Sequence, residues 1–175
     1  MMADVGCERG FLSPSLAERC EHLICIDIDH EMLVQTRRLL LGRRVNYVVA
    51  DAQRLPFRDG WAQVTVSGCV LSHLPDPAQG LREMARITRA DGALVINVPN
   101  DPWLLWLKKV VFGVLRLGRF FPGFSGGLAP SHLWEFDLSF LRTISRGIIT
   151  LERVALNAPF FTNLFVTARP VERHA

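Results

Sequence analysis

Two glycines near the N-terminus have the type and spacing needed to bind a ligand through backbone groups. Gly6 and Gly10 lie in the segment DVGCERG, which begins at Asp4. Because glycine has no Cβ, the N–H groups of such a loop can approach a ligand closely, above all at the start of a helix. An ordinary tight turn uses the same residue types, so the segment becomes informative only together with the carboxylates that follow it.

Asp27 ends an apolar run about 20 residues further on, where doubly wound folds place a carboxylate that accepts hydrogen bonds from ribose hydroxyls. A carboxylate at this point can instead cap the next helix, and Asp29 suits that role as well. We expect Asp29 to cap the helix and Asp27 to bind a ligand. Asp51 ends the next apolar run, so all three segments should meet at one edge of a parallel sheet.

The elements that would position these residues alternate along the chain. Short apolar runs typical of buried strands are separated by helical stretches, which favours the α/β class, with a Rossmann-like, doubly wound and mostly parallel sheet. We expect the last two strands to form an antiparallel pair. The predicted helices are Leu12–Arg19, Glu31–Leu41, Pro77–Arg89 and Ser139–Ile144, and the predicted strands are Leu23–Ile28, Asn46–Ala50, Ala62–Ser67, Ala93–Val98, Ile148–Ala155 and Leu164–Arg169.

Four segments resemble the class I S-adenosylmethionine-dependent methyltransferases, particularly the type 11 group that includes ubiquinone and menaquinone biosynthesis enzymes. They read DVGC from Asp4, DIDHEML from Asp27, DAQRLPF from Asp51 and LSHLPDP from Leu71. The resemblance covers nearly the whole chain. It implies S-adenosyl-L-methionine as the cofactor and a small-molecule methyl acceptor.

The resemblance also implies roles for individual residues. Gly6, Gly10 and Gly68 would lie beside the methionine part of the cofactor, and Asp27 would hold the ribose. Asp51 and the Ala52 backbone would meet the adenine amino group. We include Asp4, which opens the glycine segment, among the expected cofactor-binding residues.

Two departures from the family pattern stand in the first segment. Glu8 occupies a position where the family commonly has glycine, and only three residues precede Asp4, so we expect a truncated first strand. These departures leave open a non-catalytic or truncated methyltransferase-like binding domain. A nicotinamide-dependent oxidoreductase fits less well, because the spacing G-x-G-x-x-G is absent.

The segment Trp103–Phe121 is strongly apolar and carries four cations. As a helix it would gather these cations within one arc, as suits a helix lying at a membrane interface. A helical cap that packs on the domain or lines an acceptor pocket would show the same wide apolar face. Both interpretations favour a hydrophobic acceptor. The paired lysines argue against a helix that spans the membrane. The four cations of the segment are Lys108, Lys109, Arg116 and Arg119.

Two histidines are candidate catalytic bases, which a phenolic or hydroxyl acceptor would require. The resemblance places His73, after the fourth predicted strand, and His132, after the apolar segment, near the cofactor, and imidazole titrates in the range suited to proton removal near neutral pH. A lone histidine is more often structural, and Glu135 is a weaker candidate.

Length and composition limit the remaining possibilities. The 175 residues suit a single domain, with an insertion at about 101–130. The net charge of +3, from 20 basic and 17 acidic residues, is too small and dispersed to suggest nucleic-acid binding. The four cysteines lack the spacing of a metal site, and we expect none. The N-terminus does not resemble a signal peptide, so we expect a cytoplasmic protein with possible membrane association.

Overall fold

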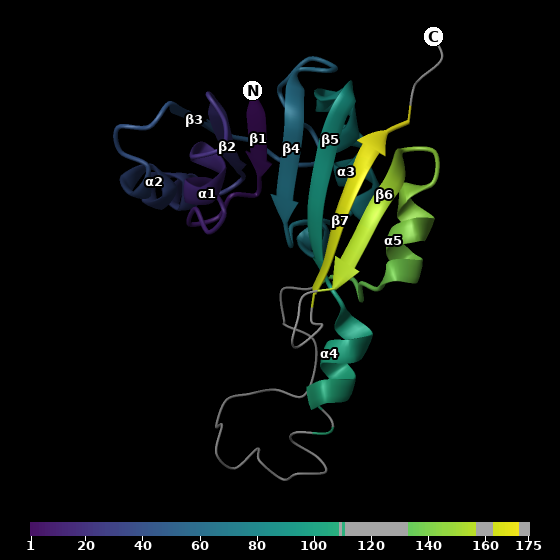
Figure 1. Ribbon diagram of the computed structural model, residues 1–175. Coiled ribbons are helices and arrows are strands. Elements are labelled where there is room, and N and C mark those ends of the chain that lie inside the picture. Colours follow the sequence, from purple (N-terminus) through teal and green to yellow (C-terminus); the bar gives the residue numbers. More distant parts are fainter. Residues whose placement is uncertain (109, 111–132, 157–162, 172–175) are drawn as a thin grey trace.

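The computed structural model describes residues 1–108, 110, 133–156 and 163–171, which include a seven-stranded sheet (Figure 1). The strand order is β3-β2-β1-β4-β5-β7-β6. The first five strands are parallel, and β7 runs antiparallel to both β5 and β6. The prediction of a mostly parallel sheet with an antiparallel closing pair is therefore confirmed. The strands are β1 (Met2–Val5), β2 (Leu23–Asp27), β3 (Val45–Val49), β4 (Ala62–Gly68), β5 (Thr88–Pro99), β6 (Ile149–Leu156) and β7 (Asn163–Pro170).

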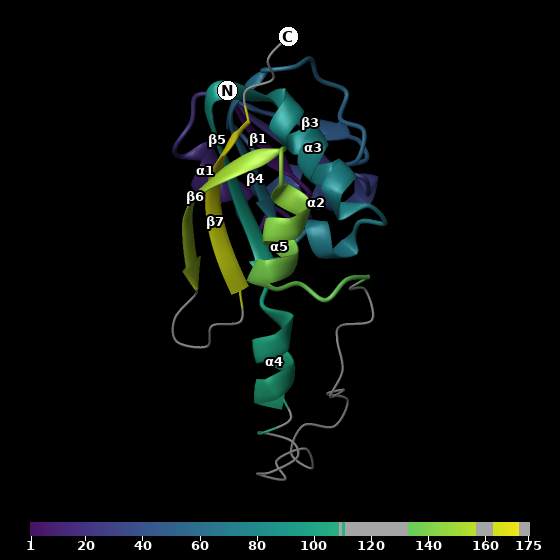
Figure 2. The same cartoon turned by 90° about the vertical axis from the view of Figure 1, so that its right-hand side faces the viewer.

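Helices cover both faces of the sheet. On one face, α1 and α2 pack over β1, β2 and β3, and on the other α3 and α5 pack over β4, β5 and β7 (Figures 1 and 2). Alternating side chains of β2 supply both layers, since Leu23 and Cys25 belong to one core and Ile26 to the other. The helices are α1 (Ser13–Ala17), α2 (His30–Leu39), α3 (Pro77–Ile87), α4 (Asp101–Lys108), α5 (Leu138–Ser145) and the 3₁₀ helix η1 (Leu71–His73).

The central strand β1 is short. Its four residues compare with about five or six in a typical strand. They nevertheless pair along their whole length with β2 on one side and β4 on the other, and Ala3 and Val5 are completely buried. Because β1 ends at Val5 and lies between β2 and β4, Gly6 lies near the middle of the carboxyl edge of the sheet.

The predicted end of the helix at Arg89 was wrong. The helix α3 ends at Ile87, and Thr88 has extended backbone angles that begin β5. The Thr88 hydroxyl donates to the Met84 carbonyl at 2.7 Å and also lies 2.7 Å from the Thr65 hydroxyl. These side-chain bonds hold Thr88 to the sheet, so Arg89 belongs to the strand. The first helix is also shorter than predicted.

The helix α4 follows β5 and extends beyond the carboxyl edge of the sheet in both views (Figures 1 and 2). Trp103 and Trp106 stack on it with ring centroids 4.8 Å apart, and 52% of Trp106 is exposed. The rest of the predicted insertion, residues 111–132, lies outside the described residues. Within the described ranges, no helix has both the length and the apolar character needed to span a bilayer.

Candidate functional site

A cavity of about 700 Å³, here called the larger cavity, lies at the carboxyl ends of β1, β2, β3 and β4. Doubly wound folds bind their ligands at this edge. The structure brings six of the predicted site residues to its wall, although they are spread over the first 73 residues of the chain. They are Gly6, Asp27, Asp51, Ala52, Gly68 and His73.

The loop after β1 depends on Gly6. Its φ of +69° lies in the left-handed region, and the N–H groups of Gly6 and Cys7 both donate to the Ile26 carbonyl, at 2.7 and 3.0 Å. A Cβ on Gly6 would collide with the Cγ2 atom of Val70, which lines the larger cavity. Glycine therefore allows both the turn and the close approach of the loop to the cavity wall.

The carboxylate of Asp27 is fixed by two backbone donors. Its Oδ2 atom accepts from the Glu8 N–H at 2.8 Å, and its Oδ1 atom accepts from the Asp29 N–H at 3.0 Å. A carboxylate has about four acceptor positions, so each oxygen of Asp27 retains capacity for a ligand hydroxyl. Asp29 caps α2 by accepting from the Glu31 N–H at 2.8 Å, which confirms its predicted role.

The loop after β3 forms another part of the wall of the larger cavity. Asp51 accepts from the Gln53 N–H at 2.8 Å, and Ala52 is buried. The Gln53 side chain accepts from the N–H of Asp76, the N-cap residue of α3, at 2.9 Å. These bonds hold the Asp51 carboxylate and the Ala52 backbone at the cavity wall.

A second cavity of about 230 Å³, here called the smaller cavity, adjoins the first. The two share Gly6, Glu8, Gly68 and Cys69 as wall residues. Asp4 lines the smaller cavity and is 1% exposed, and its Oδ2 atom accepts from the Ser13 hydroxyl at 2.6 Å. Burial, with a smaller contribution from the charge of Asp27, raises the pKa of Asp4 to about 6 against the lowering effect of the Ser13 hydrogen bond.

Other predicted residues lie elsewhere. Gly10 lines neither cavity; it is buried, with φ of +80°, and a Cβ there would lie 3.0 Å from the Cγ2 atom of Thr36 in α2. Glu135 is exposed and lines a different cavity, between the start of α4 and α5. His132 lies outside the described residues, whereas His73 is exposed at the wall of the larger cavity.

Sequence reasoning missed several residues of the smaller cavity, among them Phe11, Cys69, Asn97 and Phe165. They come from four separate places along the chain, and no motif connects them. Asn97 is opposite Gly68 in the register of β4 and β5, and opposite Phe165 in the register of β5 and β7. The pairing of the strands brings them together, and that pairing has no local signal in the sequence.

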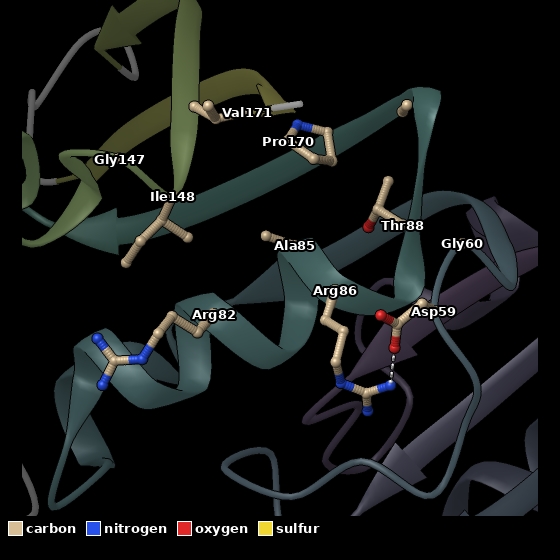
Figure 3. A pocket seen from close by; sticks show the side chains of 11 residues that line it. Asp59, Gly60, Arg82, Ala85, Arg86, Thr88, Gly147, Ile148, Pro170 and Val171 are labelled. Atoms are coloured by element: carbon tan, nitrogen blue, oxygen red, sulfur yellow. Dashed lines mark hydrogen bonds and ion pairs between the residues drawn. The ribbon is translucent and has the colours of Figure 1, made fainter. Parts of the chain in front are cut away.

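A further cavity of about 400 Å³ lies at the opposite edge of the sheet, between α3 and the ends of β5 and β7 (Figure 3). Its wall includes Arg86, which points to Asp59 and donates to it at 2.8 Å. The same guanidinium donates to Glu83 and to the carbonyls of Leu55 and Phe57. Arg86 therefore stabilises the loop before β4, and none of the predicted site residues that the structure describes lies at this cavity.

Comparison with known proteins identifies the family. Residues 3–96 match the family described as a methyltransferase domain. The chain is 34% identical over 123 residues to a demethylmenaquinone methyltransferase of Clavibacter sepedonicus, covering 65% of this chain and 50% of that protein. It is 31% identical over 97 residues to a probable S-adenosylmethionine-dependent methyltransferase of Mycobacterium tuberculosis, covering 55% and 35%.

The chain thus spans between about a third and half of the length of these curated relatives. Among solved structures, a putative methyltransferase from Bacillus halodurans matches with a TM-score of 0.73 at 16% identity, covering 97% of this chain and 92% of that one. That similarity establishes the fold. With the match over residues 3–96, it shows that the chain belongs to the class I S-adenosylmethionine-dependent methyltransferases, in the methyltransferase type 11 family.

Proposed function

We propose that the chain binds S-adenosylmethionine in the larger cavity and transfers its methyl group to a small, hydrophobic acceptor. The observation that carries this proposal is the convergence of Gly6, Asp27 and Asp51 on one cavity at the carboxyl edge of the sheet. The cofactor has groups that complement these residues: a ribose with two hydroxyls for Asp27 and an adenine amino group for Asp51. Because Gly6 has no Cβ, its loop packs closely against Val70 and keeps its backbone at the cavity wall, where a ligand can contact it.

The bound cofactor would supply an electrophilic methyl group on a sulfonium, and the residues of the chain would hold the reactants in line. Gly68 and Cys69 line both cavities, so the methionine part of a cofactor in the larger cavity would extend past them toward the smaller one, which Asp4 and Gly6 also line. His73, at the wall of the larger cavity, is the candidate base for an acceptor that must lose a proton.

Calorimetric titration with S-adenosylhomocysteine tests the cofactor site. Asp27→Asn should weaken binding about 10- to 100-fold, because hydrogen bonds to a charged carboxylate contribute roughly 1.5–3 kcal/mol. Asp29→Asn is the matched control: it removes the same charge two residues away, preserves an effective N-cap, and lies outside the cavity wall. Equal losses in the two variants would contradict the assignment of Asp27.

A folded chain with no affinity for S-adenosylhomocysteine would instead support a non-catalytic methyltransferase-like domain. The feature that favours this alternative is Glu8, whose charged side chain stands at the wall of both cavities. The titration therefore distinguishes the two functions.

We propose further that α4 contacts a membrane surface. The helix α4 extends beyond the sheet (Figure 2). Trp106 on this helix is half-exposed, and its indole is of the kind enriched at membrane interfaces. Sedimentation with phosphatidylglycerol–phosphatidylcholine vesicles should carry down the wild-type chain, and Trp106→Ser should reduce the bound fraction several-fold. Leu41→Ser, an exposed apolar residue just after α2, is the matched control. Equal binding of Trp106→Ser and the wild type would overturn the proposal.

A further inference from the structure

We infer that Trp134 is a positioning residue for the proposed cofactor site, because its indole N–H holds residues 70–75, the part of the wall of the larger cavity that includes His73. The inference rests on the proposed methyltransferase function and adds a residue that lies outside the cavity wall. It depends on three features: the few hydrogen bonds within residues 70–75, the bonds that reach this segment from Trp134 and its neighbour, and the buried contacts that fix Trp134.

Residues 70–75 follow β4 and include the 3₁₀ helix η1. Four of them line the larger cavity: Val70, His73, Leu74 and Pro75. Within the segment, the His73 N–H donates to the Val70 carbonyl at 2.9 Å, and the Leu74 N–H donates to the Leu71 carbonyl at 3.4 Å. A 3₁₀ turn has poorer hydrogen-bond geometry than an α-helix. We therefore expect contacts from elsewhere in the chain to hold this part of the wall.

Residues 133–137, here called the return segment, supply two of these contacts. The Leu133 N–H donates to the Ser72 carbonyl at 2.9 Å, and the Trp134 indole N–H donates to the Leu74 carbonyl at 2.9 Å. The Leu74 side chain packs against a glycine of α3 so closely that a Cβ there would collide with it. Leu74 is thus held from two sides, its side chain by α3 and its carbonyl by Trp134.

The return segment is anchored two residues after Trp134. The Phe136 N–H donates to the Oδ2 atom of Asp101 at 2.7 Å, and the Phe136 carbonyl accepts from the Asp101 N–H at 2.9 Å. Both residues are completely buried, and hydrogen bonds are electrostatically stronger in such surroundings than in water. Trp134 also stacks on Phe140 of α5, with ring centroids 5.7 Å apart, and Phe136 contacts the same ring edge-on at 4.9 Å. These contacts fix the direction from which the indole reaches Leu74.

The exposure of Trp134 separates a positioning role from a packing role. Trp134 is 39% exposed, whereas Phe136 is 0% exposed. Trp134 therefore contributes only part of its surface to the core, and the contact that a phenylalanine could not replace is the indole hydrogen bond to Leu74. Since Leu74 lines the larger cavity, loss of this bond should loosen the cavity wall and leave the core packed.

Trp134→Phe tests the inference because it removes the indole donor and keeps a ring that can stack on Phe140. In calorimetric titrations its affinity for S-adenosylhomocysteine should be about three- to tenfold lower than that of the wild type, as expected for the loss of one neutral hydrogen bond. Trp61→Phe is the matched control, because Trp61 stacks on Phe57 with ring centroids 4.3 Å apart and lies outside the wall of the larger cavity. It should bind as tightly as the wild type. Equal affinities of Trp134→Phe and the wild type would overturn the inference.

A spectroscopic measurement distinguishes positioning from packing. The chain has four tryptophans, so labelling with 5-fluorotryptophan gives four ¹⁹F signals, which single substitutions by phenylalanine assign. S-adenosylhomocysteine should shift the signal of Trp134 through Leu74 and leave the signal of Trp61 unchanged. A Trp134 signal that does not respond to saturating S-adenosylhomocysteine would overturn the inference, since a residue that only packs in the core would behave in this way.

Amide hydrogen exchange without the cofactor tests the cavity wall itself. In Trp134→Phe the N–H groups of His73 and Leu74 should exchange several-fold faster than in the wild type, whereas those of β4 should be unchanged. Unchanged exchange at His73 and Leu74, or equally faster exchange throughout β4, would overturn the inference. A wild-type chain that does not bind S-adenosylhomocysteine would overturn the proposed function, and the exchange measurement would still decide whether Trp134 holds residues 70–75. The two failures are therefore distinguishable.

Discussion

The backbone N–H of Glu8 donates to the Oδ2 atom of Asp27 at 2.8 Å, which joins the loop after β1 to the end of β2. The Glu8 carbonyl accepts from the Thr36 hydroxyl of α2 at 2.7 Å. Between these two bonds Glu8 adopts a φ of +49°, a left-handed conformation that glycine adopts freely. The backbone at Glu8 therefore has a conformation that suits a glycine. The Glu8 side chain is exposed and lies at the wall of both cavities.

Glu8→Gly should increase the stability of the chain by about 0.5–1 kcal/mol, because it removes the left-handed strain of a residue with a Cβ. It should also bind S-adenosylhomocysteine at least as tightly as the wild type, since both backbone hydrogen bonds remain. Urea unfolding and calorimetry measure the two effects. Glu8→Ala is the control, because it removes the carboxylate and keeps the Cβ. Lower stability of Glu8→Gly than of Glu8→Ala would contradict the strain argument.

Gly6→Ala should have the opposite effect. The new Cβ would collide with Val70 and would also carry the steric cost of a φ of +69°, so we expect a loss of about 1–3 kcal/mol in stability. Displaced Val70 atoms would narrow the larger cavity and weaken S-adenosylhomocysteine binding at least tenfold. The double variant Gly6→Ala with Val70→Ala removes the collision and should recover part of the affinity. No recovery would show that the backbone strain alone causes the loss.

The sequence was informative wherever one residue marks the end of one element. Apolar runs that end in Asp27 and Asp51 located two strands and two parts of the wall of the larger cavity, and the predicted cap of the following helix by Asp29 is confirmed. The end of α3 was missed because Thr88 is held by a contact with Thr65, which is 23 residues away in the chain. Local propensity does not register such a contact.

Part of the wall of the smaller cavity was missed for the same physical reason, although the predicted residues Asp4, Gly6 and Gly68 also line it. Cys69 and Asn97 are 28 residues apart and meet only through the register of β4 and β5. A shift of one residue in that register would place Asn97 on the other face of the sheet. Residues that act through strand pairing are therefore identified from the structure, whereas residues at strand ends can be identified from the sequence.

The buried carboxyl of Asp4 should make the stability of the chain depend on pH. Its pKa rises from 3.8 to about 6 on folding, chiefly through burial, so the folded chain holds the Asp4 proton more tightly than the unfolded chain does. Below about pH 3 both states are protonated, and Asp4 does not change the free energy of unfolding. As the pH rises from about 4 to 6, the unfolded chain releases its proton first, so the free energy of unfolding falls by at most roughly 3 kcal/mol, at about 1.36 kcal/mol per pKa unit, and it stays at this lower value above pH 6.

Asp4→Asn should therefore be more stable than the wild type at pH 7.5, by about 1–3 kcal/mol, with a difference that shrinks toward zero near pH 3. Urea unfolding at both pH values measures it. Asp91→Asn is a control of opposite sign, because the Arg89 hydrogen bond lowers the pKa of Asp91 and its stabilisation is present above the unfolded pKa. An Asp4→Asn difference that does not vary with pH would contradict the burial argument.

Ionised Asp4 should also attract the positive charge on the sulfonium of the cofactor. Asp4→Asn should therefore lose more affinity for S-adenosylmethionine, which carries this charge, than for S-adenosylhomocysteine, whose sulfur is uncharged. In that case ionised Asp4 lowers the stability of the chain and strengthens cofactor binding.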